Sequence, residues 1–216
     1  MSGDVVGAVL AGGHGRRIGA DKTSLEIGGH TLVRRAVDAL RLAGLDVALV
    51  LRHHQPVPLT AHTVAVVRDE VEDAGPLGAL HALLRWSPTE WALVAPCDQP
   101  LLAPELLRGL LSQPKDETDA IVGQPNGLLE PLPCLYRRTC LPAIESALTR
   151  GERSLRDLLS TLRVPAVPAL DLRRWDPSLV SYLNVNTQAD LDRARAIAEP
   201  ASISRRESGE PLGQRR

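Results

Sequence analysis

The stretch that decides the fold is Val5-Val-Gly-Ala-Val-Leu-Ala-Gly-Gly-His-Gly-Arg-Arg-Ile-Gly-Ala-Asp-Lys22, an apolar run that opens into a glycine-rich, basic loop. The run from Val5 to Leu10 has the length and composition of a buried strand, and the glycines after it are typical of a turn. Residues 31–43 then place apolar side chains on one helical face, with Gly44 just past the end. A buried strand followed by such a helix indicates the start of a parallel α/β sheet.

The same alternation continues along the chain, up to a final helix whose start carries the capping sequence Thr187-Gln-Ala-Asp190. The patterns predict strands at Val47–Leu51, Val64–Val67, Trp91–Ala95, Ala120–Val122 and Leu132–Tyr136, and helices at Leu77–Trp86, 139–149 and 154–162. We therefore expect an α/β fold, a three-layer Rossmann-like single domain with a mostly parallel central sheet flanked by helices. Ligands of such sheets bind at the carboxyl ends of the strands.

Composition excludes several classes of function. The 216 residues carry a net charge of -1, and aromatic residues make 2% with no Phe, which argues against nucleic-acid binding by charge or by base stacking. The three cysteines include no CxxC pair, so they favour a reducing compartment over a disulfide framework or a zinc cluster. No apolar run approaches the roughly 20 residues of a membrane helix, and we see no export signal. We expect a cytoplasmic protein that binds neither nucleic acid nor membrane.

The composition changes near the end of the chain. From Glu199 onward Ser, Arg, Glu, Gly and Pro dominate, and too few apolar residues remain to form a core. We expect residues 1–199 to form the domain and residues 200–216 to be a disordered C-terminal tail.

The loop of residues 12–22 is suited to phosphate groups. Backbone N–H groups in a glycine turn after a strand can cradle phosphate, and Arg16, Arg17 and Lys22 add positive charge. The loop is neither of the two common glycine motifs. A Walker loop requires Gly-Lys-Ser/Thr, which is absent here, and the dinucleotide fingerprint requires glycine at the position of Ile18.

This loop resembles the signature of the nucleotidyltransferases that make sugar nucleotides and dinucleotide cofactors, and within them most closely the molybdenum cofactor guanylyltransferases. Further segments match the family in order, so that the resemblance covers about residues 5–198. They are Asp69 with Gly75-Pro76-Leu77-Gly78, then Pro96-Cys97-Asp98-Gln99-Pro100, Gly151-Glu-Arg-Ser154 and Asn184-Val-Asn-Thr187. Residues 1–199 would then be a nucleotidyltransferase domain.

The resemblance implies transfer of GMP from GTP to the phosphate of molybdopterin, with Mg²⁺ as cofactor and transient contact with proteins that make or accept the cofactor. It assigns nucleotide binding to Leu10, Ala11, Gly12, Gly13, Lys22, Asp69, Gly75, Pro76, Gly78 and Asp98. Catalytic roles fall to Lys22, Arg16 and Asp98, the metal to Asp98, and acceptor binding to Asn184 and Asn186. Because the acceptor brings its own nucleophile, no Ser, Cys or His triad is required, and we expect Cys97 to be a buried structural thiol.

Three departures from the family pattern leave alternatives open. Arg52-His53-His54 stands where many relatives carry Asn, and Glu130-Pro131-Leu132 where relatives often place His before Pro-Leu. With Gln99, the segment Asp98-Gln99-Pro100 resembles that of the sister enzymes that transfer cytidylate to the same pterin. A molybdopterin cytidylyltransferase or another NTP transferase is therefore one alternative. A non-catalytic nucleotide-binding assembly factor is another, although it would not need Lys22 and Asp98.

The expected tail can be tested by truncation. Ending the chain after Glu199 should leave the melting temperature and the transferase activity unchanged, because a tail that packs on nothing contributes no burial. A melting curve and an activity assay on both chains check this, and a drop of several degrees would mean that the tail docks on the domain.

Overall fold

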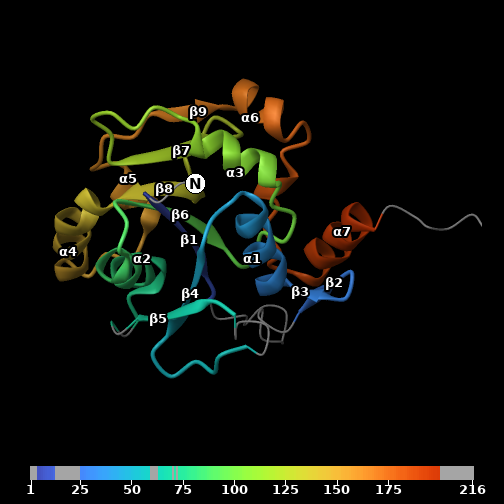
Figure 1. Ribbon diagram of the computed structural model, residues 1–216, viewed down its shortest axis with the longest axis horizontal. Coiled ribbons are helices and arrows are strands. Elements are labelled where there is room, and N and C mark those ends of the chain that lie inside the picture. Colours follow the sequence, from blue (N-terminus) through green and yellow to red (C-terminus); the bar gives the residue numbers. More distant parts are fainter. Residues whose placement is uncertain (1–3, 13–24, 59–62, 70, 72, 200–216) are drawn as a thin grey trace, which may run out of the picture.

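A computed structural model describes residues 4–12, 25–58, 63–69, 71 and 73–199 of the chain (Figure 1). Its centre is a seven-stranded sheet in the order β5-β4-β1-β6-β8-β7-β9, and a two-stranded hairpin, β2-β3, lies apart from it. The sheet strands are β1 (Val5–Leu10), β4 (Val47–Arg52), β5 (Ala65–Asp69), β6 (Trp91–Pro96), β7 (Ala120–Gln124), β8 (Glu130–Arg137) and β9 (Ala166–Pro168). The hairpin strands are β2 (Glu26–Ile27) and β3 (His30–Thr31).

One strand of the sheet runs against the others. β5, β4, β1 and β6 pair in parallel, whereas β8 is antiparallel to both of its neighbours, β6 and β7. The carboxyl ends of the parallel strands therefore share one edge of the sheet with the amino end of β8. The predicted mostly parallel sheet is confirmed.

Helices cover both faces of the sheet, which confirms the three layers (Figure 1). The face with α1 (Leu32–Leu42), α3 (Pro104–Leu111) and α6 (Ala169–Trp175) packs on Val5 and Val9 of β1, and the opposite face packs on Val6 and Ala8. That opposite layer holds α2 (Gly75–Trp86), α4 (Leu141–Thr149) and α5 (Leu155–Leu159). This alternation is the two-residue period of a strand that is buried on both faces.

A third, smaller cluster joins α7 (Gln188–Ala198) to the hairpin through the buried residues Ile27, Leu32, Val185, Leu191 and Ala194. The predicted capping sequence is confirmed, because Thr187 and Asp190 form a reciprocal capping box. Two 3₁₀ turns, η2 (Arg138–Cys140) and η3 (Val180–Tyr182), complete the connections.

The sequence pattern located the long elements and missed the short ones. The predicted strand Val5–Leu10 is β1 as it stands, and the predicted helix over 31–43 is α1 with Gly44 at φ 92° just beyond it. The hairpin β2-β3, the three-residue strand β9 and the seven-residue helix α6 were not predicted. Strands of two or three residues, such as β2, β3 and β9, are too short to display a periodicity, and their pairing partners alone define them.

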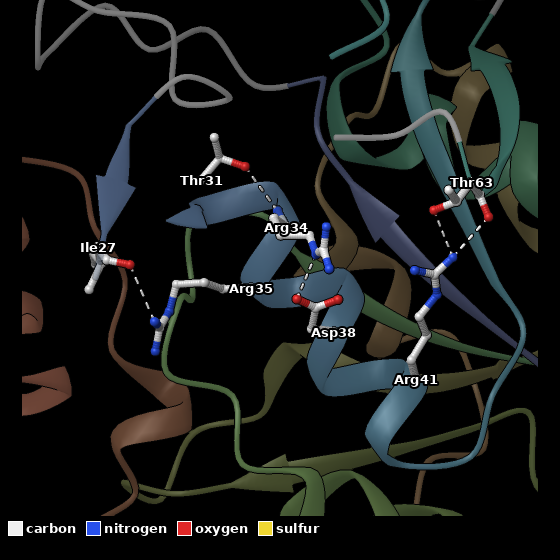
Figure 2. A network of polar contacts seen from close by, with 7 residues as sticks. All are labelled: Ile27, Thr31, Arg34, Arg35, Asp38, Arg41 and Thr63. Carbon is white, nitrogen blue, oxygen red and sulfur yellow. Dashed lines mark hydrogen bonds and ion pairs between the residues drawn. The ribbon is translucent and has the colours of Figure 1, made fainter. Parts of the chain in front are cut away.

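Polar contacts of α1 hold two neighbouring segments in place (Figure 2). Thr31 caps the helix by accepting a hydrogen bond from the Arg34 N–H at 3.2 Å. The Arg35 guanidinium donates to the carbonyl of Ile27 in the hairpin, at 3.4 Å, and to that of Pro100, at 2.8 Å. α1 therefore anchors the loop that follows β6.

All three cysteines are buried free thiols, and the buried position predicted for Cys97 is confirmed. Among the described residues, no helix is both long enough and apolar enough to cross a membrane.

Asp119 connects three segments at the amino end of β7. Its carboxylate accepts hydrogen bonds from the N–H and the guanidinium of Arg163, at 3.1 and 3.2 Å, and from the hydroxyl of Thr139, at 3.1 Å. The Arg163 guanidinium, more than any other group, holds the pKa of Asp119 below its usual value. A lowered pKa in the folded state means that the carboxylate stabilises the fold above pH ~4, and that this stabilisation is lost as the pH falls further.

Asp119→Asn should therefore lower the free energy of unfolding by about 1–2 kcal/mol at pH 7, because charge-assisted hydrogen bonds are lost. The difference from wild type should shrink at pH 3, because the unfolded wild-type chain binds a proton at this carboxylate more readily than the folded protein does. Urea unfolding at both pH values measures it, with Asp116→Asn, an exposed carboxylate nearby, as the control. Equal stability of Asp119→Asn and wild type at pH 7 would contradict this role.

Candidate functional site

A cavity of about 990 Å³ opens at the edge of the sheet where the carboxyl ends of β1, β4, β5 and β6 meet. Because β8 is reversed, its first residues, Glu130, Pro131 and Leu132, line the same cavity. Gly75 and Pro76 at the start of α2 and Arg153 in the loop before α5 complete its wall. The cavity lies where the sequence analysis placed the ligand.

The end of β1 contributes the first part of the wall. Leu10 and Gly12 line the cavity, and Ala11 between them is buried. A side chain at Gly12 would bring its Cβ within 3.1 Å of the Cγ of Arg52, so glycine lets β1 and β4 end this close together. The remaining predicted residues of this loop, Gly13, Arg16 and Lys22, lie outside the described residues.

Asp69 ends β5 and packs on the first turn of α2. Its carboxylate is buried, accepts a hydrogen bond from the Val71 N–H at 3.1 Å and also lines the cavity. A Cβ on Gly78 would lie 2.9 Å from both carboxylate oxygens, so Gly78 is required to make room for Asp69. Gly78 itself is not among the described residues that line the cavity, whereas Gly75 and Pro76 are.

Burial raises the pKa of Asp69, and this effect exceeds the opposing effects of the Val71 N–H and of nearby His81. The Val71 N–H occupies one hydrogen-bond acceptor position of the carboxylate, and a carboxylate has about four such positions. Asp69 can therefore fasten the turn and accept hydrogen bonds from a ligand at the same time.

Asp98 lies just past the end of β6, after Cys97, is half-buried, and lines the cavity, as the sequence predicted for a residue at a strand end. Its backbone carbonyl accepts a hydrogen bond from the Val185 N–H at 2.8 Å, which ties the segment before α7 to the site. Within the described ranges, no group of three or more His, Cys, Asp or Glu side chains is arranged to hold a metal ion. A single carboxylate still fits Mg²⁺, because this ion usually keeps waters and substrate phosphates among its ligands.

Gln99 determines how the neighbouring Asn184 is turned. Gln99 is 2% exposed, and its Nε2 donates to the Leu132 carbonyl at 3.1 Å and to Asn184 Oδ1 at 3.3 Å. Since Asn184 accepts with its oxygen, its own NH₂ group points away from Gln99. Asn184 lines the cavity, but Asn186 is not among the described lining residues, and its N–H donates to Asp190 at 3.1 Å.

Sequence reasoning gave no role to several residues of the cavity wall. Arg153 lies beside Gly75, where a Cβ on the glycine would come within 3.6 Å of the Cβ of Arg153. In the sequence, Arg153 stood out only because it belongs to Gly151-Glu-Arg-Ser154, one of the segments that match the family. Arg52, His53 and His54, whose role was left open, line the wall at the end of β4, and the two imidazole rings meet edge to face at 4.3 Å.

Known proteins match nearly the whole length of this chain. The chain is 30% identical to a molybdenum cofactor guanylyltransferase of Desulfosudis oleivorans, over 93% of this chain and 98% of that protein. It is 33% identical to a probable molybdenum cofactor guanylyltransferase of Pelotomaculum thermopropionicum, over 92% of this chain and 96% of that one.

Solved structures show the same fold. The molybdopterin-guanine dinucleotide biosynthesis protein A of Archaeoglobus fulgidus superposes with a TM-score of 0.80 at 29% identity, over 90% of this chain and 99% of that one. A 2-C-methyl-D-erythritol 4-phosphate cytidylyltransferase of Thermus thermophilus shares the fold at a TM-score of 0.66 and 19% identity, over 90% of this chain and 98% of that one. The MobA-like NTP transferase domain matches residues 7–167, and this chain therefore belongs to the MobA-like NTP transferase family of nucleotidyltransferases.

Proposed function

We propose that the protein transfers GMP from GTP to the phosphate of molybdopterin, forming molybdopterin guanine dinucleotide and pyrophosphate. The observation that carries the proposal is that one cavity collects residues assigned to both substrates. Gly12, Asp69 and Gly75 from the nucleotide set line it together with Asp98 and with Asn184 from the acceptor set. Relatives that match this chain over nearly its whole length are named molybdenum cofactor guanylyltransferases.

The reaction needs no nucleophile from the protein. An oxygen of the acceptor phosphate attacks the α-phosphorus of GTP, and the bond from that phosphorus to the β-phosphate oxygen breaks as pyrophosphate leaves. Catalysis then consists of bringing two anionic substrates together and compensating their charge. Cys97 is 5% exposed, which agrees with a structural thiol.

Asp98 is the residue that would hold Mg²⁺, and the bound ion would neutralise charge on the reacting phosphates. Its position just past the end of β6 supports this role, because the strand holds this segment close to Gly12, which lies just past the end of neighbouring β1.

At the nucleotide end, Asp69 would read the base. Guanine presents the N1–H and N2–H₂ donors side by side, and a carboxylate can accept both in a fork. Cytosine offers only its N4 donor edge to such a group, so a site built on Asp69 favours GTP.

At the acceptor end, the NH₂ group of Asn184 and the guanidinium of Arg153 are donors suited to an anionic phosphate. Gln99 donates a hydrogen bond to the side-chain oxygen of Asn184, so the group that Asn184 offers to a ligand is its NH₂ donor. A donor suits an anion better than a cation. Asn184 is thus proposed for the acceptor and not for the metal.

Transient contact with the proteins that supply the pterin or receive the cofactor belongs to the same proposal. The buried, reduced cysteines support a cytoplasmic location.

Asp98→Asn should reduce kcat by roughly 100-fold or more, because removing one preorganised group that stabilises charge typically costs that much. Pyrophosphate release is measured with saturating GTP, Mg²⁺ and molybdopterin, and circular dichroism confirms the fold. Asp73→Asn is a matched control, since Asp73 also lines the cavity and its φ of 52° is one that Asn tolerates. Turnover near the wild-type rate in Asp98→Asn would remove Asp98 from the metal site.

Asp69→Asn should raise the KM for GTP about tenfold or more and weaken the preference for GTP over CTP, since the amide cannot accept two hydrogen bonds in the same fork. The amide oxygen can still accept from Val71, so the turn is retained. Transfer from GTP in competition with excess CTP measures the preference in both proteins. If wild type uses CTP in preference, the guanylyl assignment is wrong. If the variant keeps the wild-type preference, only the role of Asp69 is wrong.

A further inference from the structure

Gln55 joins the ends of two neighbouring strands at the floor of the cavity. It lies just beyond β4, is 8% exposed and lines the cavity. Its side-chain Nε2 donates to the carbonyl of Ala11 at 2.9 Å, and its Oε1 accepts from the N–H of Arg52 at 3.3 Å. One neutral amide therefore satisfies a buried acceptor after β1 and a donor at the end of β4.

The backbone of Gln55 is held as well. Its N–H donates to the Arg52 carbonyl at 3.1 Å, and the guanidinium of Arg68 on β5 donates to the carbonyls of both Gln55 and Arg52. The backbone of Gln55 is therefore fixed, and its side-chain amide can hold the carbonyl of Ala11 in one position.

The contact sets the orientation of the Ala11–Gly12 peptide. The Ala11 N–H donates to the Val50 carbonyl at 2.9 Å, and the Ala11 carbonyl accepts from Gln55, so both sides of this residue are fastened. In a trans peptide the N–H lies opposite the carbonyl, and the N–H of Gly12 therefore points away from Gln55. Gly12 lines the cavity, and a glycine offers little resistance of its own to rotation of this peptide.

We propose that Gln55 is a positioning residue for the nucleotide: it holds the Ala11 carbonyl away from the phosphate groups and so keeps the Gly12 N–H turned toward them. This inference rests on the proposed nucleotidyl transfer. Without the amide donor, the Ala11 carbonyl loses its partner and the peptide can turn over. A carbonyl oxygen then faces the phosphates where an N–H stood, and repulsion replaces attraction.

Glutamate at this position provides a variant that depends on pH. The ionised carboxylate still accepts from Arg52 but adds a negative charge and has no proton to give to Ala11, whereas the protonated carboxyl is neutral and offers a donor for Ala11 and an acceptor for Arg52. Gln55→Met, which adds no charge, separates the loss of the amide from the effect of the charge. Burial favours the protonated form of the introduced group. The charged and titratable groups around it, Arg52, His53, His54, Arg68 and Asp69, are present in wild type too, so the variant is compared with wild type at each pH.

The experiment measures the dissociation constant of GTP with Mg²⁺ and without acceptor, for wild type, Gln55→Met and Gln55→Glu, between pH 5.5 and pH 8. Gln55→Met keeps the length of the side chain and should weaken GTP binding about tenfold at every pH. This is the effect of losing roughly one hydrogen bond between the protein and the nucleotide, that of the Gly12 N–H. Gln55→Glu should weaken binding about as much at pH 8 and recover most of the loss at pH 5.5. In turnover, KM should rise while kcat changes much less.

Gln124→Met and Gln124→Glu are the controls, because Gln124 also donates to a backbone carbonyl, that of Gly127 at 2.9 Å, and is not among the described cavity residues. Both should bind GTP like wild type at every pH. Melting temperatures are recorded for all variants. If Gln55→Met melts lower yet binds GTP normally, the role is structural and the inference is overturned. Gln55→Met decides the inference because it adds no charge, and a dissociation constant of Gln55→Met equal to that of wild type overturns it whatever Gln55→Glu does.

The wild-type titration separates this inference from the proposed function. If wild type binds CTP more tightly than GTP, the guanylyl assignment fails, and the same ratios measured with CTP still test Gln55.

Discussion

The pairing of β1 with a parallel strand on each side is the constraint on which the rest of the structure depends. Its six residues are buried, and the register sets Leu10 opposite Val50 of β4 and Pro96 of β6. β1 and β6 therefore end at one level and β4 runs on to Arg52, so that Gly12, Arg52 and Asp98 lie at one edge of the sheet. The helices on both faces make this arrangement rigid, because each side of β1 packs into a different core cluster.

Two glutamines perform related tasks at the floor of the cavity. Gln55 links the end of β1 to the end of β4, and Gln99 links the end of β6 to the start of β8 and to Asn184. A neutral amide can satisfy buried backbone groups without the desolvation cost of a charge. Cross-links of this kind hold the wall of the cavity and add no charge to it.

Charged groups lie on the wall around these amides. Asp69 is fastened at the start of α2 by Val71 and by the space that Gly78 leaves, and Arg153 reaches the cavity from a loop beside Gly75. The antiparallel β8 adds a further part of the cavity wall, because its reversal brings Glu130 and Leu132 to the edge where the parallel strands end. A sheet of parallel strands alone would have placed the far end of that strand here.

The sequence by itself determined the long buried strands, the face of α1, the capping box of α7 and the position of Asp98 after a strand, because local periodicity and punctuation encode all of these. It also predicted, through resemblance, that Leu10, Gly12, Asp69, Gly75, Pro76 and Asn184 belong to a site, and these residues do line one cavity. The tertiary structure alone decided the hairpin β2-β3, the strand β9, the position of Arg153 on the cavity wall, and the amide contacts of Gln55 and Gln99. Gln55 bonds a residue 44 positions away and Gln99 one 85 positions away. No local pattern carries such pairs, since only the order and direction of strands in the sheet bring their atoms together.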